Sequence, residues 1–289
     1  AIRFVPKQDV TDDDLDWADA VIGNLKPHQY NNHHLQWVQL ESAGCENFLG
    51  IDENIVLCNA TGAYGEAIAE HMVGSVLYFY KRFHQYHTNR QNHIWKNMGP
   101  VRQLAGSNVL CVGLGDIGST FAKKMHALGA NCYGVKRRMT DCPEYVQHIY
   151  SFNNMDEIIP QCDIVALSLP STPETYHIFD KRRLSLMKKD ALLINVGRGN
   201  AIDTDALVEQ LKNGWYTGVA LDVFEREPLP EDHPLWSLDN VQITPHVSGN
   251  YNMEYTLITL VNMMIDNINR FENGQPLQNQ VDRTSGYTK

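Results

Sequence analysis

The feature that most constrains this chain is a glycine-rich turn at residues 113–118. It lies between an apolar run of strand formers, 108–112, and a helical pattern, 119–128, that carries apolar residues along one face. The glycines Gly113, Gly115 and Gly118 stand at G-x-G-x-x-G spacing. Such a turn could serve packing alone, but a further predicted strand at 131–135 makes it typical of a dinucleotide-binding unit. The expected contacts to the pyrophosphate are Gly113, Gly115, Asp116 and Ile117.

Length and composition bound the kind of protein that carries this turn. The 289 residues are enough for two domains, and 43% apolar and 20% charged residues are ordinary values for a globular chain. The net charge of −10 argues against a nucleic-acid partner. No apolar stretch reaches membrane-spanning length, no signal peptide is evident, and the six cysteines lack paired or metal-ligand spacing. We therefore expect a cytoplasmic protein without membrane, nucleic-acid or metal partners.

Short apolar runs separated by helix-length gaps predict two parallel α/β units. Strands are expected in the first unit at 2–5, 19–22, 35–40 and 55–58. Strands are expected in the second unit at 108–112, 131–135, 163–169, 191–196, 218–221 and 241–243. One long helix over 65–89 is expected between the units, and an amphipathic helix over 253–271 near the end. We expect a smaller domain formed by 1–68 and 253–289, and a doubly wound, Rossmann-type domain formed by 69–252.

Three polar residues follow strand ends in the second unit, where parallel strands bring distant residues to one cleft. They are Arg198, Glu227 and His246. An arginine can pair with a substrate carboxylate and polarise a carbonyl, a histidine can deliver a proton, and a carboxylate can orient the histidine ring. This set fits the reduction of a 2-keto acid by a nicotinamide cofactor. On spacing alone, Glu227 could be a solvated loop acid and His246 a cap, whereas Arg198 between two glycines has little structural reason.

The runs that contain these residues resemble signatures of the D-isomer-specific 2-hydroxyacid dehydrogenases. The matching segments are 169–175, 195–199, 220–229, 244–249 and 279–282, so the resemblance extends over nearly the whole chain. It implies that Arg198, Glu227 and His246 are the catalytic set, and that the smaller domain is a flavodoxin-like substrate domain. It implies cofactor contacts at Pro170, Thr175, Val196, Asp222 and Gly249.

The resemblance also gives a role to the turn after the expected strand 35–40. The backbone N–H groups of this turn would hold the substrate carboxylate, as a nest of donors does for an anion. The substrate contacts it implies are Ser42, Ala43, Gly44, Arg198 and His246. Family members carry a strand–helix unit ahead of the position of Ile2, so we expect an N-terminal unit of the smaller domain to be missing.

The residues after the strand at 131–135 bear on the choice of cofactor. An NAD-linked enzyme places an acid here for the ribose 2′-hydroxyl, whereas this sequence reads Lys136, Arg137 and Arg138. These cations could form a solvated turn, but in a chain of net charge −10 they favour the 2′-phosphate of NADP. We expect NADP as the cofactor, with NAD possible and Arg137 as the main phosphate contact.

Other functions remain open on the sequence. A regulator that senses nicotinamide nucleotides shares this fold, and an NAD-linked member such as a glyoxylate/hydroxypyruvate reductase is a further alternative. A formate dehydrogenase fits less well, because that branch pairs its histidine with glutamine rather than with a residue such as Glu227. The sequence does not identify the keto acid. Its side chain is expected between residues 24–25 and the residues after His246, such as Tyr251. These segments lack the excess of cations that a phosphorylated substrate needs.

The resemblance implies a homodimer as well. In this family the stretch after the connector helix, here 89–103, reaches across to a second subunit. Its expected apolar anchors are Trp95, Met98 and Val101. A long surface loop is the alternative, but loops of this length are uncommon without a function.

Overall fold

The computed structural model describes residues 1–251 and 253–288, and the chain divides into two compact units. Residues Ala1–Tyr64 and Tyr251–Lys289 form the smaller unit, and Gly65–Asn250 form the larger one. The boundaries expected from the sequence, after residues 68 and 252, lie within four residues of these.

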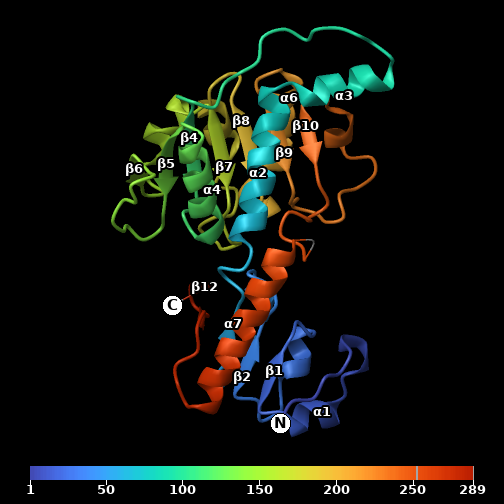
Figure 1. The fold of residues 1–289 in the computed structure, drawn as a ribbon, viewed down its shortest axis with the longest axis vertical. Helices are drawn as coiled ribbons and strands as arrows, with labels where there is room; N and C mark the ends of the chain where they lie inside the picture. Colours follow the sequence, from blue (N-terminus) through green and yellow to red (C-terminus); the bar gives the residue numbers. More distant parts are fainter. Residues whose placement is uncertain (252, 289) are drawn as a thin grey trace. The chain divides into compact units, whose positions relative to one another are not determined.

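The larger unit is built on a parallel sheet whose strands all end at the same edge (Figure 1). Within the described residues this sheet has seven strands in the order β10-β9-β8-β7-β4-β5-β6. They are β4 (Asn108–Val112), β5 (Asn131–Val135), β6 (His148–Tyr150), β7 (Ile164–Leu167), β8 (Leu192–Asn195), β9 (Gly218–Leu221) and β10 (Val241–Ile243). The chain order reverses between β4 and β7, which is the point where such sheets bind ligands at the carboxyl ends of their strands. The expected Rossmann-type arrangement is therefore confirmed.

Helices cover this sheet and bury its continuous apolar strands. They are α2 (Gly65–Tyr80), α4 (Asp116–Ala127), α5 (Lys181–Leu186) and α6 (Thr204–Lys212). A further helix, α3 (Phe83–Gln91), follows α2 and packs against it. α2 and α4 pack side by side (Figure 1), and Lys124 Nζ lies 2.6 Å from Glu66 Oε2 between them. The strands beneath are almost fully buried, as parallel strands between two helical layers require. Over both units, the described residues also form short 3-10 helices, at Lys7–Asp9, Pro27–Tyr30, Glu46–Phe48, Met155–Glu157, Ile159–Gln161, Gly199–Ala201 and Pro234–Ser237.

The long helix expected over 65–89 is wrong, because the chain breaks between α2 and α3. Arg82 adopts a left-handed backbone conformation with φ of 59°, which ends α2. The returning chain holds this break: Arg82 Nε donates to the carbonyl of Pro100 at 2.8 Å, and Lys81 Nζ donates to the carbonyl of Arg102 at 2.7 Å. The periodic pattern of apolar residues predicted one helix because it carries no information about these contacts, which come from residues some twenty positions away.

The smaller unit contains a second parallel sheet. In its described part the order is β1-β2-β3, with β1 (Ala20–Ile22), β2 (Trp37–Gln39) and β3 (Val56–Cys58). The helices are α1 (Asp12–Trp17) and α7 (Glu254–Glu272), and a short hairpin joins β11 (Val281–Asp282) to β12 (Tyr287–Thr288). The central strand β2 is fully buried. The two α/β units expected from the sequence are confirmed.

The strand expected at residues 2–5 is wrong. These residues are assigned to no helix or strand, and Phe4 leaves 93% of its surface exposed. A strand requires a neighbour for its backbone groups, and the described residues offer none to this segment. Arg3 instead lies 4.3 Å from the ring centre of Trp17 and pairs with Asp14 at 2.6 Å.

Candidate active site

Three loops at the carboxyl ends of β8, β9 and β10 carry the residues expected to do chemistry. Arg198 follows β8, Asp222 and Glu227 follow β9, and His246 follows β10. These three strands are neighbours in the sheet and run parallel. The topology therefore gathers at one edge residues that span almost fifty positions of sequence.

Glu227 and His246 form a direct pair. The Nδ1 atom of His246 lies 2.8 Å from Oε2 of Glu227. The other oxygen of Glu227 accepts a hydrogen bond from the backbone N–H of Phe224 at 3.0 Å, which fixes the carboxylate. Glu227 is thus no solitary loop acid. His246 is not a helix cap either, because the N-cap residue of α7 is Met253. The imidazole keeps 49% of its side-chain surface exposed, so its Nε2 edge can meet a ligand.

Asp222 anchors the loop that carries His246. Its buried carboxylate accepts from the hydroxyls of Thr244 and Ser248 at 2.6 and 2.5 Å, and from the backbone N–H groups of Val247 and Ser248. Burial by itself would raise the pKa of Asp222, but these hydrogen bonds outweigh it and lower that pKa below its usual range. The backbone N–H of His246 also donates to the Asp222 carbonyl at 2.8 Å. This geometry gives Asp222 a task within the protein beside the nicotinamide contact that the resemblance implies.

Arg198 stands in a loop shaped by close backbone packing. The Asn195 side chain donates to the Arg198 carbonyl at 2.9 Å and accepts from the Gly197 N–H at 3.1 Å. A Cβ at Gly197 would meet the backbone of Leu169, and one at Gly199 would overlap the backbone of Phe224. The two glycines therefore have a structural reason that the sequence did not reveal. They let three loops lie directly against each other under Arg198.

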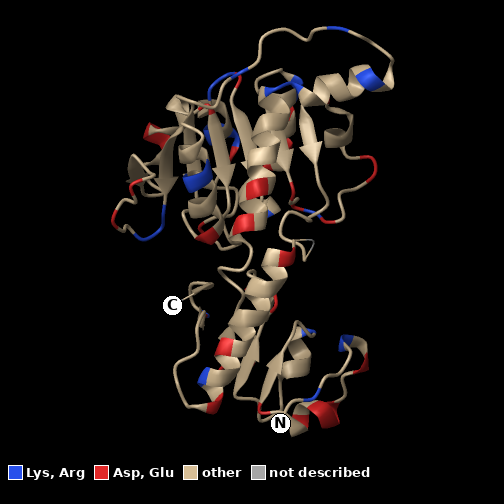
Figure 2. Cartoon of the chain, in the orientation of Figure 1, with Lys and Arg blue, Asp and Glu red and all other residues tan. Residues whose placement is uncertain are grey.

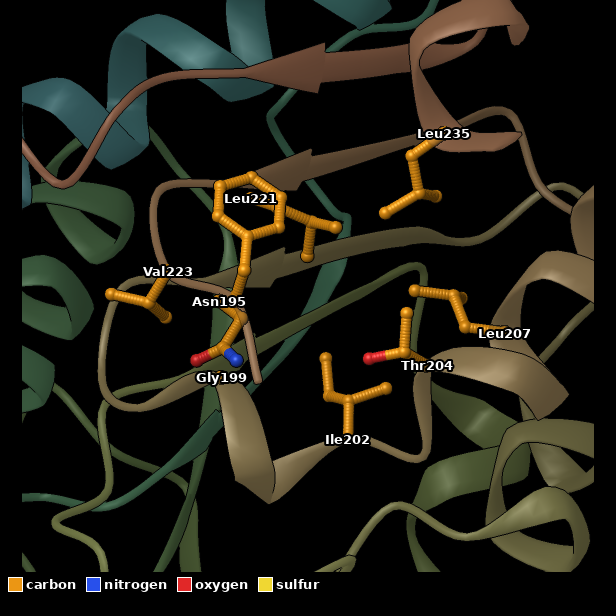
Figure 3. Close-up of a pocket in the computed structure, with 9 residues that line it drawn as sticks. Asn195, Gly199, Ile202, Thr204, Leu207, Leu221, Val223 and Leu235 are labelled. Carbon is orange, nitrogen blue, oxygen red and sulfur yellow. The ribbon is translucent and has the colours of Figure 1, made fainter. Parts of the chain in front are cut away.

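A small cavity lies beside this loop, as Figure 3 shows. Its volume is about 10 Å³, which is room for no more than one water molecule. Most of its walls are apolar; the lining residues are Asn195, Gly199, Ile202, Thr204, Leu207, Leu221, Val223, Phe224 and Leu235. The cavity is thus a small gap in the packing beneath the Arg198 loop, and it is too small for a substrate.

The glycine-rich turn has the properties expected of a phosphate site. Gly113 has a φ of 100°, and Gly118 packs so closely on the Gly113 carbonyl that no Cβ fits there. A Cβ at Gly115 would meet no protein atom within 4 Å, so its space is open. In the part of the chain that is described, no residue accepts a hydrogen bond from the backbone N–H of Ile117, in the first turn of α4. Asp116 begins that helix, its carboxylate close to Gly65.

The basic residues expected at the ribose follow β5. Lys136, Arg137 and Arg138 lie at the carboxyl end of that strand, and Figure 2 shows Lys and Arg gathered in the segment after β5. Lys136 Nζ donates to the Thr140 hydroxyl at 3.1 Å. A hollow of about 420 Å³ opens beside Arg137 and has the size of a small-molecule site. Its lining residues are Arg137, Ser151, Phe152, Asn153, Glu174, Ile178 and Arg183.

The remaining expected cofactor contacts differ in how they are placed. Pro170 follows β7 and is partly exposed, whereas Thr175 is completely buried. The Thr175 hydroxyl donates to the Pro170 carbonyl at 2.7 Å, so its side chain holds the loop that carries Pro170. Val196 is buried at the end of β8, and Gly249 directly follows the buried Ser248.

The expected carboxylate-binding turn lies in the smaller unit. Each carbonyl of Ser42, Ala43 and Gly44 accepts a hydrogen bond, from the Ala60 N–H at 3.0 Å, the Asn59 side chain at 2.7 Å and the Ser42 hydroxyl at 2.6 Å. By contrast, none of the described residues accepts from the three N–H groups of this turn. Because its carbonyl groups are already hydrogen-bonded within the protein and its N–H groups are available, this turn suits the binding of an anion.

Sequence reasoning missed the residues that hold these loops. Thr244 and Ser248 were part of a recognised run, but only the position of Asp222 shows what their hydroxyls do. A second unexpected pair joins His177 Nε2 to Glu225 Oε1 at 2.6 Å, and Glu225 also accepts from the Thr204 N–H. No local sequence pattern predicts such contacts between loops.

Across the described residues, no helix is long and apolar enough to cross a membrane, and no three His, Cys, Asp or Glu side chains are grouped to hold a metal.

The fold and the turn at its switch point define a protein of the Rossmann dinucleotide-binding class. A family model described as D-isomer specific 2-hydroxyacid dehydrogenase, NAD binding domain, matches residues 73–248. The chain belongs to the D-isomer-specific 2-hydroxyacid dehydrogenase family.

Relatives and solved structures are consistent with this membership. The glyoxylate reductase of Thermofilum pendens is 38% identical over 204 residues, which are 68% of this chain and 59% of that protein. The chain thus spans about three fifths of the length of that relative. A family member from Aeromonas salmonicida matches at TM-score 0.83 and 30% identity, covering 94% of this chain and 87% of the other. An NADPH-dependent glyoxylate/hydroxypyruvate reductase from Sinorhizobium meliloti, solved with NADP and sulfate, matches at TM-score 0.83 and 26% identity, covering 93% and 86%.

Proposed function

We propose that this protein is an NADP-linked reductase that converts a small 2-keto acid to the D-2-hydroxy acid. The observation that carries the proposal is the Glu227–His246 pair on loops next to the loop of Arg198. A proton donor, an orienting carboxylate and a planar cation are the groups that carbonyl reduction requires.

The residues have separate tasks in this reaction. Arg198 binds the carboxylate of the keto acid and polarises the carbonyl through its planar N–H donors. His246 delivers a proton from Nε2 to the carbonyl oxygen, because Nδ1 is engaged by Glu227. Glu227 holds the ring in one orientation and stabilises its positive charge. Asp222, through Thr244 and Ser248, keeps the His246 loop in place. A bound nicotinamide would supply the hydride.

The turn at the start of α4 fits the pyrophosphate of such a cofactor. The open space at Gly115 and the available N–H of Ile117 are what an anion at a helix N-terminus needs. Gly113 and Gly118 make the tight turn and the close packing that bring the backbone there. The residues present therefore fit the cofactor.

The cation-rich end of β5 supports NADP over NAD. Arg137 borders a hollow large enough for part of a nucleotide, and Lys136 and Arg138 add positive charge at the same strand end. An acid in their place would repel the 2′-phosphate. The relative from Sinorhizobium meliloti, described as NADPH-dependent, supports the same choice.

Two further features belong to this proposal. Five of the six cysteines are buried and only Cys142 is exposed, which suits the cytoplasmic location that we propose.

The arm after α3 has no helix or strand until β4 (Figure 1). Trp95 on this arm is completely exposed. An exposed tryptophan on an arm fits a contact with a second copy of the chain, so we propose a homodimer. Met98 is half-buried and its N–H bonds the Tyr86 hydroxyl, so it is a weaker anchor than Trp95 or Val101.

The function is tested by His246→Ala. Wild-type protein is expected to oxidise NADPH in the presence of 2-keto acids, and the variant to lose about 10²–10⁴-fold in kcat/KM while NADPH binding stays within a few-fold. His126→Ala, an exposed histidine of α4, serves as the matched control and keeps full activity. Near wild-type turnover in His246→Ala overturns the assignment. Binding of NADPH without turnover of any keto acid indicates a nucleotide-sensing regulator instead.

A further inference from the structure

Glu41 directly adjoins the expected carboxylate-binding turn of the smaller unit, Ser42–Gly44. Glu41 directly precedes Ser42, and its backbone is fixed on both sides: its N–H donates to the Asn24 side chain at 2.9 Å, and its carbonyl accepts from the Tyr64 hydroxyl at 2.5 Å. The Asn24 side chain also donates to the Ser42 hydroxyl at 3.0 Å. The backbone of Glu41 is therefore held beside the turn by side chains of two other segments.

The Glu41 side chain has only a weak partner. Its Oε2 lies 3.5 Å from the Tyr251 hydroxyl, the outer limit of a hydrogen bond, and no cation pairs with it anywhere in residues 1–251 and 253–288. Burial, followed by the nearby charge of Glu41, raises the pKa of Tyr251. Burial and the neighbouring Tyr251 raise the pKa of Tyr64. Both phenols therefore stay protonated as donors beside this carboxylate.

A carboxylate in this position opposes the task of the turn. The available N–H groups of Ser42, Ala43 and Gly44 attract an anion, and a neighbouring negative charge weakens that attraction. This loss of attraction is offset only when the incoming molecule also brings a hydrogen-bond donor to Glu41. A molecule with a second acidic group would meet added repulsion.

We infer that Glu41 is a specificity residue that selects 2-keto acids whose side chain presents a hydrogen-bond donor, such as a hydroxyl, and rejects those with a second acid. The inference rests on the proposed reductase activity and narrows its substrate. A site built around an acceptor discriminates strongly against analogues that lack the donor, because the acceptor is then left unpaired.

The test compares four keto acids by kcat/KM with NADPH. Glyoxylate has no side chain and serves as the reference, pyruvate has a methyl group, hydroxypyruvate has a hydroxyl, and oxaloacetate has a second carboxylate. Wild type is expected to prefer hydroxypyruvate over pyruvate by a factor on the order of 10–100 in kcat/KM. It should disfavour oxaloacetate relative to glyoxylate by a factor of the same order. Glu41→Gln should lower the first preference and raise the oxaloacetate-to-glyoxylate ratio by about tenfold or more. Taking ratios cancels any effect that the lost charge has on every anionic substrate alike.

Glu53→Gln is the matched control, because it removes one exposed carboxylate from the same unit at a position twelve residues further along the chain. It should leave all the ratios unchanged. If wild type turns over none of the four acids, the proposed function fails. If it turns them over but the ratios are the same in wild type and Glu41→Gln, or shift equally in Glu53→Gln, the inference about Glu41 is wrong and the reductase stands.

Discussion

At the scale of single residues, the lack of a side chain at Gly199 helps to position the charged side chain of Arg198. Its missing Cβ allows the loop of Arg198 to lie against the backbone of Phe224, three residues before Glu227. Gly199→Ala must push these loops apart. We expect kcat/KM to fall at least tenfold, and the melting temperature to fall by several degrees, since overpacking costs roughly 1–3 kcal/mol.

The matched control for this substitution is Gly74→Ala. Gly74 lies inside α2, and a Cβ there meets nothing within 4 Å. This variant should keep its activity, and its melting temperature should stay the same or rise, because alanine forms a helix better than glycine does. Unchanged kinetics in Gly199→Ala would show that the packing of the loop does not position Arg198.

At the scale of elements, the basic end of β5 offers a test of the proposed choice of cofactor. Arg137→Asp replaces attraction for the 2′-phosphate by repulsion, so kcat/KM with NADPH should fall by one to two decades or more while that with NADH stays or rises. Higher salt should narrow the wild-type preference, because exposed charge pairs are screened. Lys189→Asp, an exposed residue of the same unit, makes the same change of charge and should do neither. Equal wild-type efficiency with both cofactors would mean that these cations only face solvent.

The sequence predicts elements well where the signal is local. Strands β4, β5, β9 and β10 begin and end where their apolar patterns do, since burial on both faces produces that pattern. The break at Arg82 and the absent strand at 2–5 depend on distant partners, which a window of sequence does not contain. β6 was missed because it is an edge strand of only three residues, too short to show a pattern, and only Ile149 in it is buried.

The candidate site, like the fold, could be predicted from the sequence only where the signal is local. Arg198, Glu227 and His246 could be named from motifs, because residues at the ends of parallel strands share an edge. The sequence did not show that Asp222 is enclosed by Thr244 and Ser248. Nor did it show that the glycines beside Arg198 serve neighbouring backbone. These are contacts between loops, and each is settled by the whole fold.

At the scale of the whole molecule, the arm after α3 predicts the assembly. Trp95 and Val101 leave 104% and 52% of their surface exposed, a large apolar exposure for one segment. Sedimentation velocity at micromolar concentration should show a dimer, and Trp95→Glu should shift it toward monomer. Phe4→Glu, at a residue 93% exposed in the smaller unit, should not. A wild-type protein that sediments only as monomer rules the dimer out.

The burial of the cysteines has a practical consequence for thiol chemistry. Only a thiolate attacks an alkylating dye, and burial raises the pKa of Cys132 and of Cys162 to about 12. Cys142, by contrast, is exposed in the segment between β5 and β6, four residues after Arg138. A maleimide fluorophore should therefore label the native protein at one position. That position lies close enough in the chain to the basic residues for the dye's emission to follow nucleotide binding directly, with no keto acid present.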